Sequence, residues 1–205
     1  DDVESRGLGD VYKRQIILCE TFGGRLHLAH ISTKGTAELV RQAKKRGVNV
    51  TCETCPHYFA ADDSMVAAYD TATKVNPPLR TKEDGEAIKA ALKDGTIDCI
   101  VTDHAPHHQD EKNVEYDIAL NGISGIETSV PLSLGLVRDG VLTIDELITK
   151  MSVNPARILG VEGGVIAEGK PADITIIDPE AKYVFKKEDI ISKGKNSPFI
   201  GREMQ

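Results

Sequence analysis

Hydrophobic and polar residues follow two different periods along the first half of the chain. Residues 25–31, 48–52 and 97–101 have the length and apolar content of short strands. Between them, residues 33–46 and 81–94 carry their apolar side chains on one helical face, and each of these segments begins near a threonine and ends at a glycine. Strands that alternate with amphipathic helices predict an α/β fold with a parallel sheet and crossover helices.

The pattern changes in the last third of the chain. Thr143 and Glu146 have the spacing of a capping box, and Asn154-Pro155 is typical of the start of a second short helix. Residues 172–178 and 182–185 then have the apolar alternation of strands. We therefore expect a helix and a small β appendage over residues 151–205.

The first residues differ from the rest. Residues 1–15 show no apolar period, and residues 10–15 are similar to translated sequencing-adapter sequence. We expect this segment to be disordered or non-native and to lie outside the fold, which then begins at residue 16. The chain is accordingly divided into residues 16–150 and 151–205.

Composition narrows the class of protein. Of the 205 residues, 40% are apolar and 28% are charged, and no apolar run approaches the roughly 20 residues of a membrane span. A net charge of −7 argues against a partner held mainly through nucleic-acid phosphates. Four cysteines in a chain of this length do not form a disulfide framework, so the cytoplasm is the expected compartment.

A cluster of polar residues directly follows the third predicted strand. Asp103 and His107 lie there, with His104 and His108 beside them. Ligands of parallel α/β sheets bind at the carboxyl ends of the strands, where a carboxylate can ligate a metal or move a proton. For His104 and His108 a solvated polar loop is an equally good interpretation, whereas the position of Asp103 and His107 after a buried strand favours function.

Similar residues follow the first two predicted strands. His30 is placed to ligate zinc if the first and third strands end at one edge, where it would meet Asp103. One of Glu53, Thr54 and His57 is expected to face the same edge. His27 is interpreted as structural.

Three further motifs are less specific. Cys52 and Cys55 form a C-x-x-C that has no second cysteine pair to complete a zinc site, so coincidence is the favoured interpretation. Residues 76–80 (NPPLR) present the Asn76 amide on a proline-stiffened loop that suits a polar or anionic ligand. Residues 121–125 offer backbone amides where glycine allows close approach. An ordinary turn explains either loop equally well.

Taken together, these motifs resemble the dihydroorotase family of cyclic amidohydrolases. Seven segments carry the resemblance: residues 30–34 (HISTK), 76–80 (NPPLR), 102–107 (TDHAPH), 122–128 (GISGIET), 154–157 (NPAR), 169–173 (GKPAD) and 196–199 (NSPF). The resemblance implies a partial TIM-like (β/α)₈ barrel, whose last three strands lie within residues 16–150, followed by a small β-sandwich segment. It also implies the reversible, zinc-dependent cyclisation of N-carbamoyl-L-aspartate to L-dihydroorotate.

The resemblance assigns roles to individual residues. His30 corresponds to a ligand of one zinc of a binuclear centre, and Asp103 corresponds to a ligand of the other metal and to the group that takes and returns the proton. Asn76, His107, Asn121 and Gly122 correspond to substrate-binding positions. The implied partner is a small anionic substrate, together with either a second copy of the chain or aspartate carbamoyltransferase.

The family's remaining metal ligands have no counterpart in the chain. The His-x-His of the first barrel strand, the substrate arginine after it, the bridging carboxylate or carbamylated lysine and the histidine of the fifth strand would all lie upstream. We therefore expect the chain to match the carboxyl-terminal portion of the family and to be inactive by itself. Two alternatives stay open: another cyclic amidohydrolase such as a hydantoinase, or a metal-free scaffold for aspartate carbamoyltransferase.

Overall fold

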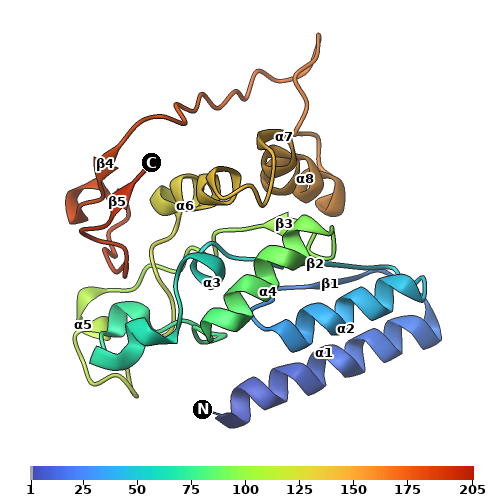
Figure 1. The fold of residues 1–205 in the computed structure, drawn as a ribbon, viewed down its shortest axis with the longest axis horizontal. Coiled ribbons are helices and arrows are strands. Elements are labelled where there is room, and N and C mark those ends of the chain that lie inside the picture. Colours follow the sequence, from blue (N-terminus) through green and yellow to red (C-terminus); the bar gives the residue numbers. More distant parts are fainter. Residues whose placement is uncertain (1) are drawn as a thin grey trace.

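The computed structural model describes residues 2–205, with side chains from residue 9 onward. Most of the ordered elements are helices, and the strands are short (Figure 1). In chain order the elements are α1 (Asp2–Phe22), β1 (Leu26–Leu28), α2 (Lys34–Lys45), β2 (Val50–Thr54), α3 (His57–Ala60), η1 (Asp63–Ala68), η2 (Thr71–Thr73), α4 (Lys82–Lys93), β3 (Cys99–Ile100), α5 (Gln109–Lys112), α6 (Ile126–Arg138), α7 (Ile144–Ile148), η3 (Thr149–Val153), α8 (Asn154–Leu159), β4 (Tyr183–Val184), η4 (Lys187–Asp189) and β5 (Glu203–Met204).

The strands β1, β2 and β3 form a parallel sheet in that order, which confirms the expected α/β arrangement. Leu26 pairs with Val50, and Glu53 pairs with Cys99. The helix α2 crosses from β1 to β2, and α4 leads into β3 (Figure 1). Because all three strands point the same way, the loops that follow them emerge at one edge. The sheet is open, with β1 and β3 as its two edges.

The predicted caps of the crossover helices are confirmed. The Thr33 hydroxyl accepts a hydrogen bond from the Thr36 backbone N–H, and Thr81 caps α4 in the same way. Thr143 and Glu146 form the expected capping box of α7. The helix expected to start separately at Asn154 instead continues from α7 through the π-helical turn η3, and its Pro155 occupies the first turn without breaking the helix.

Two apolar clusters hold the elements together. The larger one joins the sheet to α1, α2, α4, α6 and α7 and is built mainly of aliphatic side chains. The smaller one contains Phe185 and Phe199, both 1% exposed, with Tyr58 and Ile123. Burial of each large apolar side chain contributes about 1.5–3 kcal/mol. The second cluster therefore fastens the carboxyl-terminal segment to the loops that follow the sheet.

The amino-terminal segment, which we expected to be disordered or non-native, is helical in the described residues. Residues 2–15 belong to the helix α1, although Asp1 and the side chains of residues 2–8 lie outside the described part. Ile16 is buried in the larger cluster, and the Tyr12 hydroxyl donates a hydrogen bond to the Ala29 carbonyl at 2.9 Å. Among the residues of α1 whose side chains are described, Tyr12, Ile16 and Cys19 contact the larger cluster, so the packed face extends past residue 15.

The expected β-sandwich segment is also not formed among residues 2–205. Residues 172–178 are extended without strand pairing, and Ile174 and Ile176 are 60% and 93% exposed. A strand is stable when a neighbour satisfies its backbone hydrogen bonds, and no neighbour lies beside this segment in the described structure. The carboxyl-terminal β structure consists of β4 and β5, which pair antiparallel.

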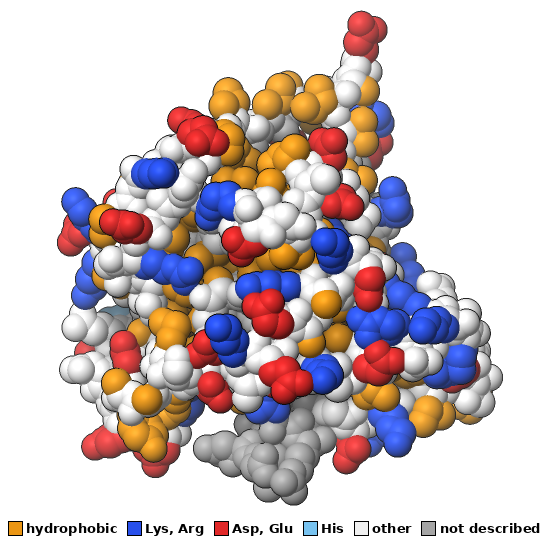
Figure 2. Space-filling model, viewed as in Figure 1, with side chains coloured by type: hydrophobic (Ala, Val, Ile, Leu, Met, Phe, Trp, Pro, Cys, Tyr) orange, Lys and Arg blue, Asp and Glu red, His pale blue; other side chains and the backbone are white. Residues whose placement is uncertain are grey.

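The surface shows no concentration of one charge on the face in Figure 2, where basic and acidic side chains are interspersed. Among residues 2–205, no helix is both long enough and apolar enough to cross a bilayer.

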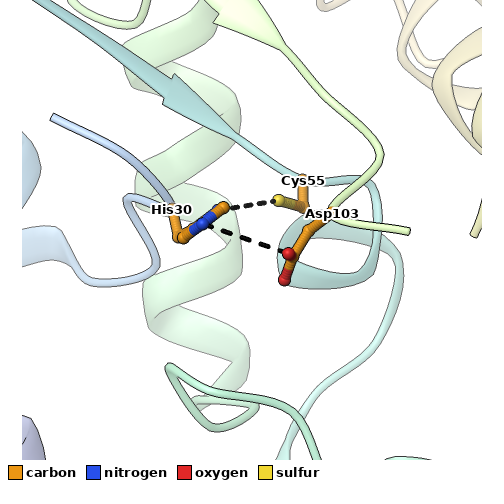
Figure 3. A group of neighbouring side chains, drawn as sticks. All are labelled: His30, Cys55 and Asp103. Atoms are coloured by element: carbon orange, nitrogen blue, oxygen red, sulfur yellow. Dashed lines mark hydrogen bonds and ion pairs between the residues drawn. The ribbon is translucent and has the colours of Figure 1, made fainter. Parts of the chain in front are cut away.

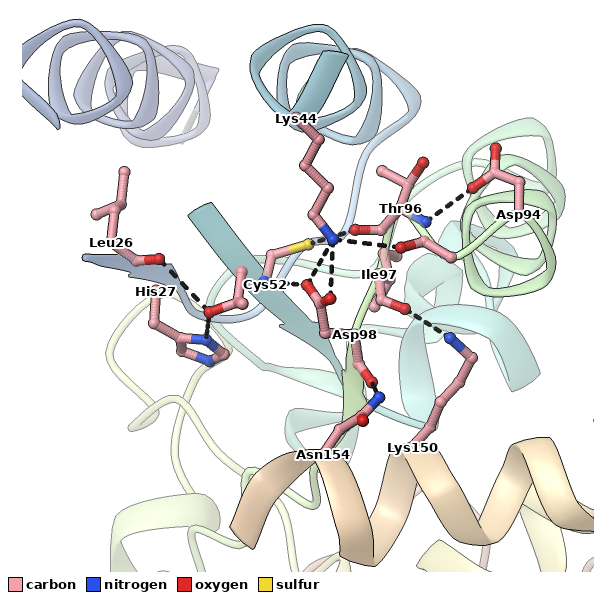
Figure 4. A network of polar contacts seen from close by, with 12 residues as sticks. Leu26, His27, Lys44, Cys52, Asp94, Thr96, Ile97, Asp98, Lys150 and Asn154 are labelled. Carbon is pink, nitrogen blue, oxygen red and sulfur yellow. Dashed lines mark hydrogen bonds and ion pairs between the residues drawn. The ribbon is translucent and has the colours of Figure 1, made fainter. Parts of the chain in front are cut away.

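A polar network joins the sheet to the helices on both of its sides (Figure 4). The Asp98 carboxylate, just before β3, accepts hydrogen bonds from Lys44 of α2 at 2.8 Å and from the Cys52 backbone N–H of β2 at 2.8 Å. From the other side, the Asn154 amide donates to the Asp98 carbonyl at 2.9 Å, and the Lys150 ammonium donates to the Ile97 carbonyl at 2.7 Å. One residue thus links α2, β2 and α8.

The Asp98 network makes a prediction about stability. Asp98→Asn keeps the side-chain shape but removes the charge that pairs with Lys44, so we expect a loss of about 1–3 kcal/mol in the free energy of unfolding. Asp94→Asn is the matched control. The pair of Asp94 with Arg41 is more exposed, and its loss should cost less than about 1 kcal/mol. Denaturant unfolding of both variants measures the difference, and equal losses would contradict the central role of Asp98.

Candidate active site

His30 and Asp103 meet at the edge where the parallel strands end. His30 follows β1, and Asp103 follows β3. The distance from His30 Nε2 to Asp103 Oδ1 is 4.0 Å (Figure 3). The two side chains are 33% and 25% exposed, so the pair is reachable from solvent. Residues 73 positions apart in the chain are therefore neighbours because the strands before them run in parallel.

Both residues have an unusual backbone. His30 has a φ of 58° and Asp103 a φ of 46°, in the left-handed region. Among the described residues, Tyr69 is the only other non-glycine residue there. Such conformations cost on the order of 1–3 kcal/mol each and cluster at functional sites. The chain accepts this strain at the two positions where sequence analysis placed metal ligands.

Cys55 is a third member of the group that sequence analysis did not select. Its side chain is fully buried, and its Sγ lies 3.7 Å from His30 Nδ1. One potential ligand atom from each of His30, Cys55 and Asp103 lies within 4.8 Å of the others. The available signal was the C-x-x-C, but only its second cysteine faces the site. The Cys52 thiol instead donates to the Thr96 carbonyl at 3.3 Å.

Behind His30 lies a row of polar contacts. His30 Nδ1 is 3.7 Å from Glu53 Oε1, and the other oxygen, Glu53 Oε2, is 2.9 Å from His27 Nε2. His27 Nδ1 is in turn 2.8 Å from the Thr51 hydroxyl. Of the candidates after the second strand, Glu53 thus faces the site, whereas the Thr54 hydroxyl donates to the Ile31 carbonyl. The contacts of His27 on the strand agree with its structural interpretation.

The electrostatics of the group suit a cation. Within the described structure, the Asp103 and Glu53 carboxylates lie within 4.0 Å of histidine nitrogens and form no ion pair with a lysine or arginine. Burial, reinforced by these two carboxylates, raises the pKa of the Cys55 thiol. Burial and the nearby His30 lower the pKa of His57 to about 3, and His57 Nε2 is buried without a hydrogen-bond partner. Nitrogen, sulfur and oxygen donors of this kind fit zinc.

A second group contains three of the predicted substrate-binding residues. The His107 Nε2–H donates to the Asn121 carbonyl at 2.8 Å. Gly122 follows with a φ of 134°, and a Cβ at this position would lie 3.0 Å from His107 Nε2 and 2.6 Å from the Ala105 Cβ. Only glycine allows the loop to approach this closely. The structure therefore brings His107, Asn121 and Gly122 together.

The carboxyl-terminal segment holds this second group in place. The Asn196 Oδ1 accepts from the His107 backbone N–H at 3.1 Å, and its Nδ2 donates to the Gly122 carbonyl at 2.8 Å. Lys112 also donates to the Gly122 carbonyl at 3.2 Å, and the Ser124 hydroxyl donates to the Gly194 carbonyl at 2.6 Å. Asn196 thus holds the loops of His107 and Gly122 together, although it is distant from both in the sequence. We call these two hydrogen bonds the Asn196 clamp.

The remaining candidates have other surroundings. Asn76 is exposed, and no contact joins its side chain to either group in the part of the chain described. His104 Nδ1 accepts from the Gly125 N–H at 3.1 Å, at the start of α6. His108 caps the short helix α5 through its Nδ1. These two histidines therefore stabilise loop and helix ends.

A basic cavity of about 260 Å³ adjoins His107. Its lining includes Lys112, Lys187, Lys193 and Lys195 and contains no carboxylate. Burial, with a contribution from Lys74, lowers the pKa of Lys112 to about 8. The chain is acidic overall, yet the surroundings of His107 are locally basic.

Comparison with known proteins shows the family of the chain. The chain belongs to the amidohydrolase family, whose model matches residues 19–200. It is 57% identical over 191 residues to the dihydroorotase of Geotalea daltonii and 56% identical over 197 residues to that of Endomicrobium trichonymphae. These alignments cover 93% and 95% of the chain but 45% and 47% of those proteins, so the chain spans about half the length of the curated relatives it matches.

Solved structures give the same fold. The L-hydantoinase (dihydropyrimidinase) from Arthrobacter aurescens superposes with a TM-score of 0.90 at 30% identity, and the dihydropyrimidinase from Brevibacillus agri superposes with a TM-score of 0.88 at 25% identity. Each superposition covers 96% of this chain and 45% of the other.

The Asn196 clamp makes a prediction. Asn196→Ala leaves the His107 N–H and part of the Gly122 carbonyl's hydrogen bonding unsatisfied in a buried position, so we expect a loss of about 1–3 kcal/mol in the free energy of unfolding. Hydrogen exchange at the His107 amide should quicken as well. Asn113→Ala changes an exposed asparagine whose side chain forms no hydrogen bond in the described structure, and it should alter stability by less than about 0.5 kcal/mol. An unchanged His107 exchange rate in Asn196→Ala would rule out the clamp.

Proposed function

We propose that the chain contributes to a metal-dependent dihydroorotase, which interconverts N-carbamoyl-L-aspartate and L-dihydroorotate with release or uptake of water. The observation that carries the proposal is the convergence of His30 and Asp103, both in left-handed backbone, at the carboxyl edge of the parallel sheet. Identity of 53–57% to curated dihydroorotases supports this substrate over those of the hydantoinases, which match at 25–30%. The three parallel strands are proposed to belong to a (β/α)₈ barrel.

In this proposal His30 and Asp103 hold zinc. When bound, zinc lowers the pKa of water and polarises the amide carbonyl. The Asp103 carboxylate accepts the proton of the attacking water and returns it to the ring nitrogen as the C–N bond breaks, and the same steps run backward in cyclisation. A carboxylate suits this exchange because one group can accept the proton and return it.

The second group is proposed to bind the substrate. His107, the Gly122 and Asn121 backbone and the Asn76 amide offer hydrogen bonds to the carboxylates of the substrate. The basic cavity beside His107 supports an anionic ligand, because it raises the local concentration of anions on an acidic chain. Asn196 would then be a positioning residue, since its side-chain amide holds His107 and Gly122 at the wall of this cavity.

A chimaera tests the proposal. In it, the matching 191 residues of the Geotalea daltonii dihydroorotase are replaced by this chain. We expect zinc-dependent ring opening of L-dihydroorotate, and Asp103→Asn should reduce kcat by about 10²–10⁴-fold because the proton acceptor is lost. The matched control is Asp110→Asn, which changes the same charge on an exposed carboxylate and should leave kcat unchanged.

The alternatives give different results. Ring opening of hydantoin or dihydrouracil, but not of dihydroorotate, would favour the hydantoinase interpretation. A folded chimaera that binds no zinc and opens no ring would favour the scaffold. The 205-residue chain by itself is expected to show no turnover, because His30, Cys55 and Asp103 are too few donors for a binuclear centre.

A further inference from the structure

We propose that the basic cavity beside His107 binds the phosphoryl group of a second anionic ligand, with the Lys112 ammonium as its buried contact. The inference goes beyond the proposed function, because the lining of this cavity contains neither His30 nor Asp103. An anion held there lies beside the proposed substrate group without touching the proposed metal ligands. The phosphoryl group belongs either to inorganic phosphate or to a larger phosphorylated molecule.

Lys112 is a buried cation without a counter-ion. It is 6% exposed, and its ammonium donates to the Leu120 carbonyl at 2.8 Å and to the Gly122 carbonyl at 3.2 Å. One of its three N–H groups is thus left without a partner in the described structure. Burial and the nearby Lys74 lower its pKa to about 8, and Asp70 opposes this shift without forming an ion pair. Because a buried charge without an opposite charge is unfavourable, an anion that reaches this N–H group gains a charge-assisted hydrogen bond.

Three further lysines line the cavity. Lys187, Lys193 and Lys195 are exposed, and within the described residues none of them forms an ion pair. Lys195 donates to the Ile190 carbonyl at 2.7 Å, whereas the Lys187 and Lys193 ammonium groups have no hydrogen-bond partner there. No carboxylate belongs to the lining. Four ammonium groups around one space attract an anion of high charge, and a phosphoryl group carries about −1.5 to −2 at pH 7.

The size and the support of the cavity favour a small ligand. Its volume of about 260 Å³ is below the roughly 300–1,000 Å³ typical of pockets for drug-sized molecules. Gly194 packs against the loop of His107, since a Cβ there would lie 2.4 Å from the His107 carbonyl oxygen. The Gly194 carbonyl also accepts from the Ser124 hydroxyl at 2.6 Å. These contacts fix the backbone between Lys193 and Lys195, which reduces the ordering cost of binding.

Phosphate binding to the 205-residue chain tests the proposal. Isothermal titration calorimetry at pH 7 and constant ionic strength should detect one saturable site for inorganic phosphate. Lys112→Met removes the ammonium but keeps most of the side-chain length, and it should weaken binding at least about tenfold because a charge-assisted hydrogen bond is lost. Lys187→Gln combined with Lys193→Gln removes two exposed charges and should weaken binding about three- to tenfold.

The matched control is Lys45→Gln combined with Lys182→Gln. It removes the same two charges from exposed positions outside the cavity and should leave the affinity for phosphate unchanged. Circular dichroism checks the folding of Lys112→Met, and the exposed Lys187 and Lys193 decide the result if that variant is unfolded. Unchanged affinity in the Lys187→Gln, Lys193→Gln variant would overturn the proposal, as would an equal loss in the control.

Two further ligands identify what the cavity holds. If adenosine monophosphate binds at least as tightly as inorganic phosphate, the source is a larger phosphorylated molecule, and weaker binding identifies free phosphate. Either result supports the site. N-carbamoyl-L-aspartate should not displace phosphate from the parent chain. Competitive displacement would assign the cavity to the substrate and overturn the inference while the proposed function stands, whereas an inactive chimaera would leave phosphate binding unaffected.

Discussion

The candidate site depends on the backbone hydrogen bonds that align three short strands in parallel. These bonds continue past the ends of the strands. The Ile31 N–H donates to the Glu53 carbonyl at 2.8 Å, and the Val101 N–H donates to the Thr54 carbonyl at 2.9 Å. Each bond fixes a residue within one or two positions of His30 or Asp103. The ladder therefore determines the backbone positions of His30 and Asp103. A shift of the strand register by one residue would move their side chains to the other face of the sheet.

The strain at the site needs support from the rest of the fold. Two left-handed residues cost on the order of 2–6 kcal/mol in total, a large fraction of the stability of an ordinary domain. The larger apolar cluster and the Asp98 network at the amino end of β3 hold β2 and β3 between helices on both sides. This packing holds the strands that lead into the two strained residues. The positions of His30 and Asp103 follow from packing elsewhere rather than from their own preferences.

Much of the sheet and its crossover helices could be predicted from sequence, because hydrophobic period, caps and terminal glycines all agree there. His30 and Asp103 could be predicted for the same reason, since strand ends in a parallel sheet share an edge. Cys55 could not be predicted, because a C-x-x-C indicates a metal site only when both cysteines face the same place. Here the Cys52 and Cys55 thiols point in different directions. The helix α6 could not be predicted either, because Pro131 and Gly135 lie inside it and its buried face includes polar residues such as Ser133. The strand expected at residues 172–178 has the right alternation but no partner.

The two halves of the site are held by different parts of the chain, and this has a functional consequence. His30, Cys55 and Asp103 are positioned by the sheet, whereas His107 and Gly122 depend on Asn196, which lies 89 residues beyond His107. The smaller apolar cluster, with Phe185 and Phe199, carries that dependence. Under the proposed function, contacts of a distant segment can therefore change the proposed substrate-binding group without disturbing the proposed metal ligands. A fold of this kind can alter its substrate by changing one group of loops while the strand ends keep the same chemistry.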